Sequence, residues 1–364
     1  EPSLVTMTSH SSPPTTSVCP VSLQWWRRQE NNEHSDGDAT SGDSPAWLRH
    51  SVRHCIETEN EHRRLSVVEI FSLSPSSSRA SSASTSSASS SSSLNGLLEK
   101  LSDQTEITVF FVHGAGGRSE QFIEQAKALI VDATARGLCV RVLLYDHLGH
   151  GHSAKPLHDP HLYSTDALVS DLRHMLSRFG SARNAIVAHS YGTSLTLSTL
   201  ASHPDLASAV HALLLLAPSQ QPPPGVSHPI WYLPAFALEW VRPLMQRPFQ
   251  EGAFAAHTRE QLPLLVAHEG EAGARNPMYM MRSLMRGMQW ATESEVRTVR
   301  QPALILCGAE DAITSAAQGS ALVEWIPNAR AEVLEHSSHV LMLEQRERVN
   351  ELLLDHLAVH VYRV

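Results

Sequence analysis

The sequence has few cysteines, no excess of basic residues and no long apolar run. Its four cysteines are widely spaced without a C-x-x-C pair, and Cys139 and Cys307 fall in apolar runs where buried free thiols are common. This usage favours a reducing compartment. A formal net charge of −9 leaves no basic stripe for nucleic acid. The longest apolar stretches, such as residues 212–217, fall far short of the roughly 20 residues that span a bilayer. We therefore expect an intracellular, cytoplasmic protein with neither a transmembrane segment nor a nucleic-acid partner.

Two segments of the chain are poor in apolar residues. Residues 1–50 mix serine, proline, threonine, histidine and aspartate with little periodicity, which predicts a flexible extension. Trp25 and Trp26 interrupt this composition, either as a docking element or, as we favour, as a local contact with the core. Residues 75–93 are nearly all serine and alanine, a composition that cannot bury enough apolar surface to order itself. This second segment is predicted to be a solvated loop.

The remaining sequence alternates apolar, strand-like runs with helical periods. A hairpin is predicted first, from residues 51–59 and 65–74 on either side of a polar turn. Further strands are expected at 107–112, 139–146, 184–188, 210–217, 302–311 and 330–335, and helices at 119–136, 165–179, 191–200, 316–326 and 341–359. Because these runs are apolar almost throughout, both faces of the strands should be buried. We therefore predict an α/β fold with a mostly parallel sheet and helices on both faces.

The alternation of strands and helices is interrupted over residues 219–299. This segment begins with a proline-rich stretch and continues with helical patterns. We interpret this segment as a helical cap inserted between two parts of the core. The first part of the core would be residues 51–218, and the second part would be residues 300–364.

Four methionines of the insertion, Met278, Met281, Met285 and Met288, fall at helical spacing on one face. In one interpretation their flexible thioethers line an adaptable pocket for acyl chains, which makes Met281 and Met285 candidate substrate contacts. In the other interpretation, which we favour, they fill a seam between the cap and the core.

Ser190 stands at the joint between an apolar run and a stretch of small residues, in IVAHSYGTS. A strand has to turn sharply into a helix there, and the small residues Ala188 and Gly192 allow that turn. Such a turn strains the backbone and exposes the hydroxyl at the carboxyl end of a strand, where reactive groups collect. The N–H of Tyr191, at the start of the helix, would then point an unpaired donor toward an oxyanion beside Ser190. An isolated serine here would more often be a helix cap.

A nucleophilic serine needs an adjacent base that is itself oriented by an acid. Asp311 closes the run LILCGAED and His339 follows the strand-like run AEVLE, which gives the chain order Ser, Asp, His expected for this kind of turn. Glu310 and His336 are the competing acid and base. His189 is next to the serine and should point to the other side of the chain as a packing residue.

A second group of ionisable residues, Asp146, His147, His150 and His152, has the imidazole and carboxylate donors that suit zinc. The glycines between them make this stretch a flexible loop instead of a rigid ligand face. We therefore predict neither a metal nor another cofactor.

Five motifs lie in order at the ends of the predicted strands: VHGAGG, DHLGHGHS, AHSYG, GAEDAIT and SSHVLMLEQRERVNELLLDHL. Over residues 60–362 the chain resembles an α/β-hydrolase of the abhydrolase-domain type. The resemblance implies an eight-stranded sheet and a serine nucleophile, and its spacing favours Asp311 over Glu310 and His339 over His336. It also implies an oxyanion hole formed by the N–H groups of Tyr191 and Ala115, with Gly116 as the alternate to Ala115.

The loop that carries VHGAGG is rich in glycine, which lets the backbone approach the substrate closely and makes Gly114 and Gly116 candidate substrate contacts. The sequence departs from the family at two places. Ala188 replaces the usual first glycine of G-x-S-x-G and adds crowding at the turn. Leu148 replaces an arginine that many relatives have, so a polar tether is lost there.

The sequence thus predicts a serine hydrolase that cleaves carboxylic esters, with a lipid or other acyl ester as substrate, through an acyl-enzyme. Two alternatives stay open. One is an acyltransferase or thioesterase that uses the same three residues, and the other is a catalytically silent scaffold that keeps the fold. Peripheral contact with a membrane also stays open.

Overall fold

The computed structural model describes residues 51–58, 63–72, 100–157, 159–223 and 225–363. The predicted extension with Trp25 and Trp26 and the serine-rich loop lie outside the described residues. No helix within the described ranges is both long and apolar enough to cross a membrane.

One eight-stranded sheet lies at the centre of the fold, in the order β1-β2-β4-β3-β5-β6-β7-β8. β1 and β2 form the predicted hairpin, β2 is also antiparallel to β4, and the other neighbouring pairs are parallel. The predicted sheet of eight mostly parallel strands is confirmed. The strands are β1 (Ser51–Glu57), β2 (Arg64–Phe71), β3 (Ile107–Val112), β4 (Val140–Tyr145), β5 (Arg183–His189), β6 (Val210–Leu216), β7 (Ala303–Gly308) and β8 (Ala329–Leu334).

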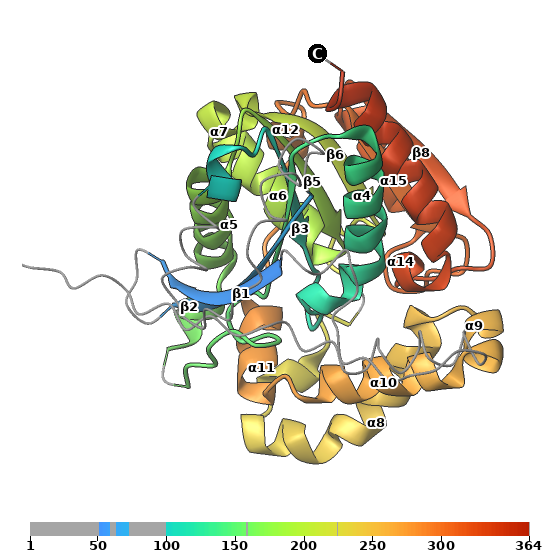
Figure 1. Cartoon of the computed structure of the whole chain (residues 1–364). Coiled ribbons are helices and arrows are strands. Elements are labelled where there is room, and N and C mark those ends of the chain that lie inside the picture. Colours follow the sequence, from blue (N-terminus) through green and yellow to red (C-terminus); the bar gives the residue numbers. More distant parts are fainter. Residues whose placement is uncertain (1–50, 59–62, 73–99, 158, 224, 364) are drawn as a thin grey trace, which may run out of the picture.

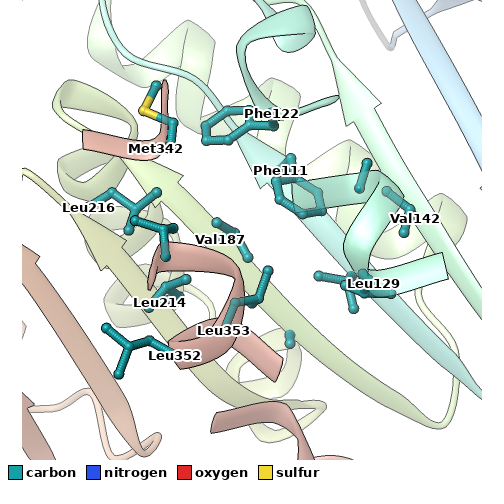
Figure 2. Packing of buried hydrophobic residues seen from close by; sticks show 14 of the residues in the cluster. Phe111, Phe122, Leu129, Val142, Val187, Leu214, Leu216, Met342, Leu352 and Leu353 are labelled. Carbon is teal, nitrogen blue, oxygen red and sulfur yellow. The ribbon is translucent and has the colours of Figure 1, made fainter. Parts of the chain in front are cut away.

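Helices pack on both faces of this sheet, as predicted (Figure 1). On one face, α4 and α15 bury apolar residues against the strands, and Phe111, Leu129, Val187 and Leu353 belong to this core (Figure 2). On the other face, α5 and α6 cover a second apolar core. Every residue of β3 and β4 is buried, as expected for strands covered on both sides. The helices and short 3-10 turns of this part are η2 (Ser119–Phe122), α4 (Ile123–Arg136), η3 (Pro160–Tyr163), α5 (Thr165–Phe179), α6 (Tyr191–Ser202), α7 (Pro204–Ser208), α13 (Ala316–Trp325), α14 (Leu341–Glu344) and α15 (Arg346–His360).

The last helix departs from the prediction. A single helix over residues 341–359 was expected, but the chain forms α14 and α15 with a break at Gln345, whose φ of −120° and ψ of 47° are not helical. The side-chain amide of Gln345 donates to the carbonyl oxygens of Glu335 and His336, each at 3.3 Å. The prediction was wrong because these contacts come from the preceding loop, which apolar periodicity does not report.

Residues 219–299, here called the inserted segment, connect β6 to β7. Its helices α8 to α11 lie together beyond one end of the sheet (Figure 1). The division of the chain into a core and a separate cap stays a prediction. The elements of the inserted segment are η4 (Pro229–Tyr232), α8 (Ala235–Ala253), α9 (Ala256–Gln261), α10 (Pro263–Ala274), α11 (Met278–Gly287) and α12 (Glu293–Val296).

Candidate active site

Ser190 lies in the sharp turn between β5 and α6. Its φ of 53° is positive, a conformation that a residue other than glycine adopts only under strain. Gly192 lets the turn close, because a Cβ at that position would lie 2.5 Å from the carbonyl oxygen of Val112. Gly114 approaches equally closely, since a Cβ there would lie 2.7 Å from the Cβ of Ser190. The serine side chain is thus held against the glycine loop, residues 113–117.

His339 connects Ser190 to Asp311. Its Nε2 atom lies 2.8 Å from Ser190 Oγ, and its Nδ1 atom lies 2.9 Å from Asp311 Oδ2. All three residues are buried. When Nδ1 donates its proton to the carboxylate, Nε2 is left as the acceptor for the serine hydroxyl. Three side chains that are far apart in the sequence therefore meet in the arrangement of nucleophile, base and acid.

The competing acid and base lie elsewhere. Glu310 Oε2 accepts the backbone N–H of Ala256, the first residue of α9, at 3.0 Å. The ring of His336 packs 6.2 Å from that of His257. Neither side chain takes part in the contacts of Ser190.

Asp311 is surrounded by donors. Its Oδ1 atom accepts the backbone N–H groups of Ile313 and Thr314, each at 2.8 Å. Burial alone would raise the pKa of Asp311, but the charge and hydrogen bond of His339, with these two N–H groups, outweigh it and hold the pKa below its usual value. The carboxylate is therefore ionised at neutral pH.

Sequence reasoning missed Thr314. Its hydroxyl lies 2.9 Å from Asp311 Oδ2, 3.1 Å from His339 Nδ1 and 3.1 Å from the carbonyl oxygen of Ala217. The residue thus contacts both Asp311 and His339. Its place three residues after Asp311 is the one signal that the sequence offers.

His189 also differs from expectation. We predicted a packing residue that points to the other side of the chain, but its ring lies 4.9 Å from the ring of His339. Its Nε2 atom is 2.8 Å from the carbonyl oxygen of His339. His189 therefore packs directly on His339.

Two N–H groups of this region are candidates for binding an oxyanion. Within the described residues, the N–H groups of Ala115 and Tyr191 donate no hydrogen bond. Tyr191 is the first residue of α6, where a backbone N–H has no partner one turn earlier. Gly116, the alternate donor, is already occupied, because its N–H donates to His150 Nε2 at 3.1 Å. The geometry therefore favours Ala115 and Tyr191.

His113, the first residue of the glycine loop, is buried together with His147 and His150. The N–H of His147 donates to His113 Nε2 at 2.9 Å, and His147 Nε2 lies 2.9 Å from the carbonyl oxygen of His113. Burial lowers the pKa of His147 to about 3 and that of His150 to about 4, so both are neutral at pH 7. Asp146 accepts the backbone N–H groups of Ser119 and His152, each at 2.8 Å. In the part of the chain that the structure describes, no group of three or more histidine, cysteine or acidic residues is placed to hold a metal ion.

The methionines of α11 fill a seam inside the inserted segment. Met278, Met281 and Met285 form an apolar cluster with Trp231 and residues of α8. Met281 and Met288 pack on the second apolar core, as in the favoured seam between the insertion and the core, whereas Met278 and Met285 belong to the cluster within the insertion. Met281 also reaches the core, where its Cε atom lies 3.5 Å from the position of a Cβ on Gly116. Of the two predicted contacts, Met281 is therefore the one placed beside the glycine loop.

The comparisons with known proteins agree with this fold. The model of the alpha/beta hydrolase family matches residues 109–352, most of the chain. The chain belongs to the alpha/beta hydrolase family. It is 29% identical to Protein ABHD8 of Mus musculus over 255 residues. The aligned residues cover 69% of this chain and 55% of that protein. It is 26% identical to the 2-hydroxymuconate semialdehyde hydrolase of Pseudomonas putida over 280 residues. The aligned residues cover 72% of this chain and 92% of that hydrolase.

This alpha/beta hydrolase thus spans about half the length of ABHD8. Among solved structures, a thermophilic esterase from Thermogutta terrifontis has a TM-score of 0.62 at 16% identity, covering 84% of this chain and 98% of that one. At such identity the likeness shows the fold alone. The reaction and the substrate have to be argued from the site.

Proposed function

We propose that this alpha/beta hydrolase cleaves carboxylic esters with an apolar acyl part, through an acyl-enzyme on Ser190. The observation that carries the proposal is the pair of contacts made by His339, 2.8 Å to Ser190 Oγ and 2.9 Å to Asp311 Oδ2. The first distance is that of a hydrogen bond through which a proton passes between nucleophile and base, and the second is that of a hydrogen bond that orients the imidazole.

In the first step, Ser190 Oγ attacks the carbonyl carbon of the ester while His339 Nε2 takes the hydroxyl proton. The carbonyl oxygen becomes negative and accepts hydrogen bonds from the N–H groups of Ala115 and Tyr191. The bond to the alcohol oxygen then breaks, and the alcohol leaves with the proton from His339. Asp311, which is ionised, stabilises the imidazolium in between.

In the second step, His339 takes a proton from a water molecule, whose oxygen attacks the acyl carbon on Ser190. The second tetrahedral intermediate breaks its bond to Ser190 Oγ, which recovers the proton from His339. The products are a carboxylic acid and the free enzyme.

The apolar acyl part is inferred from the inserted segment, which we propose to act as a cap. Met281 lies beside Gly116 in the glycine loop, and the methionine cluster of α11 continues behind it. Thioether side chains of this kind adapt to flexible apolar chains. We therefore place the acyl chain of the substrate along α11, with Gly114 and Gly116 close to the ester group.

Labelling with a fluorophosphonate tests the nucleophile. Wild-type protein should gain one adduct, mapped to Ser190 by mass spectrometry, and Ser190→Ala should gain none. Ser208→Ala, which alters a serine at the end of α7, should label like the wild type. Folded wild-type protein that takes up no label would refute the proposal and support the silent scaffold.

A panel of p-nitrophenyl esters of rising chain length tests the acyl part. We expect kcat/KM to rise from acetate to esters of medium or long chains, and Ser190→Ala to abolish turnover of all of them. A preference for acetate would contradict the apolar acyl site while leaving the nucleophile intact. Measuring release of the free acid beside release of nitrophenol distinguishes hydrolysis from transfer of the acyl group to another acceptor.

A further inference from the structure

Helix α8 carries a row of exposed apolar side chains. Phe236, Trp240 and Leu244 recur every four residues on one face of the helix, and Tyr232 and Leu233 come just before it. Within the described part of the chain, their exposed fractions range from 40% for Leu233 to 81% for Trp240. We call these five residues the exposed stripe. Single exposed apolar residues are ordinary, but a contiguous row marks an interaction site.

The exposed stripe is separate from the packing of the inserted segment. The rings of Phe236 and Trp240 contact each other edge to face, with centroids 6.2 Å apart, and so form one continuous surface. A different face of α8 is used for packing, since Leu238 is fully buried beside Trp231 and Met278. In Figure 1, α8 is the outermost helix of the inserted segment, on the side away from the sheet. The stripe is therefore placed to meet another surface.

Arginines lie along one border of the exposed stripe. The guanidinium of Arg286 lies 5.0 Å from the ring centroid of Tyr232, and Arg282 Nε donates to the carbonyl oxygen of Leu233 at 2.8 Å. Residues 277–290, which contain both arginines, have no acidic residue. Residues 229–290 hold six arginines and five glutamates, so this region is close to neutral. The whole chain, in contrast, has a net charge of −9. The border of the stripe thus complements an anionic surface.

We propose that the exposed stripe docks on the surface of an anionic lipid bilayer. A helix face with Trp, Phe and Leu next to arginines has the composition of helices that lie in the plane of a membrane interface. The aromatic rings would enter the headgroup region, and Arg282 and Arg286 would bind lipid phosphates. A second copy of the chain is the competing occupant, which the oligomeric state in solution tests.

The assignment of a substrate to this surface rests on the proposed function. Beneath the stripe, α8 packs on the methionines of α11, and Met281 of that helix lies beside Gly116 in the glycine loop. Apolar side chains therefore lie between the docking face and Ser190. Ester-bearing lipids of the bilayer are the substrate class that such a surface would present to the site.

Co-sedimentation of the whole chain with vesicles tests the docking. We expect binding to vesicles of phosphatidylcholine with phosphatidylserine, weaker binding to phosphatidylcholine alone, and release by salt. The double variant Phe236→Ser with Trp240→Ser should lose at least about tenfold in partition coefficient, because two aromatic anchors no longer enter the interface. A matched control, Val131→Ser with Val359→Ser, removes two exposed apolar residues of α4 and α15 and should bind like the wild type.

Three results would overturn the docking proposal: wild type that binds neither vesicle, a stripe variant that binds as tightly as wild type, or a dimer in solution that the stripe variant converts to monomer. Thermal melting of each variant checks that it is folded. Ser190→Ala should bind vesicles like the wild type, and fluorophosphonate labelling of the stripe variant should be unchanged. Failure of docking and failure of the proposed hydrolase function are thus measured separately.

Discussion

Arg118 and Glu269 form a bidentate ion pair between the loop after the glycines and α10 of the inserted segment. Arg118 Nη1 lies 2.9 Å from Glu269 Oε2, and Nη2 lies 2.5 Å from Oε1. Gln121 donates to the same carboxylate at 2.9 Å, and Asn276 donates from the inserted segment to the carbonyl oxygen of Gly116 at 2.7 Å. The position of the glycine loop is therefore coupled to the position of α10.

Removing the carboxylate from this pair should be costly. In Glu269→Gln the largely buried guanidinium of Arg118 loses its bidentate partner and keeps the weaker contact of Nε with Glu120 Oε2 at 3.4 Å, so we expect a loss of about 2 kcal/mol in the free energy of unfolding. Turnover of a p-nitrophenyl ester should also fall, because the glycine loop is less well positioned. Urea unfolding and steady-state kinetics measure the two effects. The double variant Arg118→Met with Glu269→Gln should recover part of the stability, and equal stability of single and double variants would contradict this reading.

A second prediction concerns His150, which accepts the N–H of Gly116 at 3.1 Å. In His150→Phe that partly buried N–H loses its acceptor, which costs about 1 kcal/mol and loosens the loop that holds Ala115. We expect kcat to fall about tenfold or more. In His150→Gln the amide oxygen can replace Nε2 as the acceptor, so most of the activity should remain. Equal activity of the two variants would show that the hydrogen bond does not position the loop.

Thr314 should act as a positioning residue for the acid and the base. Thr314→Val removes the hydroxyl that lies between Asp311 Oδ2 and His339 Nδ1, and we expect kcat to fall by about three- to tenfold with KM little changed. Thr314→Ser keeps the hydroxyl and should restore the rate. The pH profile of kcat/KM is the decisive measurement. In Thr314→Val the apparent pKa of the base should shift, whereas it would stay unchanged if the Thr314 side chain only filled space.

Buried neutral histidines predict a loss of stability in mild acid. Burial lowers the pKa of His147 and His189 to about 3 and that of His150 to about 4, whereas an unfolded histidine titrates at about 6.5. Between pH 6.5 and pH 4 the unfolded chain therefore binds protons that the folded chain does not. The free energy of unfolding should fall as the pH drops through this window, by about 1.4 kcal/mol per pH unit for each such histidine.

Urea unfolding at a series of pH values from 7.5 to 4.5 measures this slope. His150→Gln should flatten it by the share of one histidine. His161→Gln, which alters an exposed histidine, should leave the slope unchanged. The same slope in wild type and His150→Gln would mean that His150 is protonated in the folded protein.

The site shows which contacts could be predicted from the sequence and which could not. Ser190, Asp311 and His339 each follow a strand of the parallel sheet, so their order along the chain and the alternation of strands and helices were enough to bring them to one edge. The contacts that support them were not predictable in this way. Arg118 with Glu269 joins a loop to helix α10 through side chains more than a hundred residues apart, and no period or spacing reports such a pair.

Close backbone contacts at glycines were predictable only in part. The need for a small residue at Gly192 follows from the sharp turn, and the structure supplies the reason in the carbonyl oxygens of Val112 and His113. Gly308 was not singled out, although a Cβ there would lie 2.2 Å from the carbonyl oxygen of Ser338. That contact depends on how the loop before His339 folds back on β7, which local sequence does not determine.

The two small residues beside Ser190 should therefore respond differently to substitution. In Gly192→Ala the new methyl group would lie 2.5 Å from the oxygen of Val112 and 2.7 Å from that of His113, and neither backbone atom can move without disturbing the sheet. We expect a loss of at least about 3 kcal/mol in stability. Ala188 is fully buried in β5, and Ala188→Gly, which introduces the usual family residue, should cost only about 1–2 kcal/mol. Unfolding of both variants in urea tests the contrast, and a Gly192→Ala protein as stable as Ala188→Gly would mean that the turn at Ser190 is wider than these contacts require.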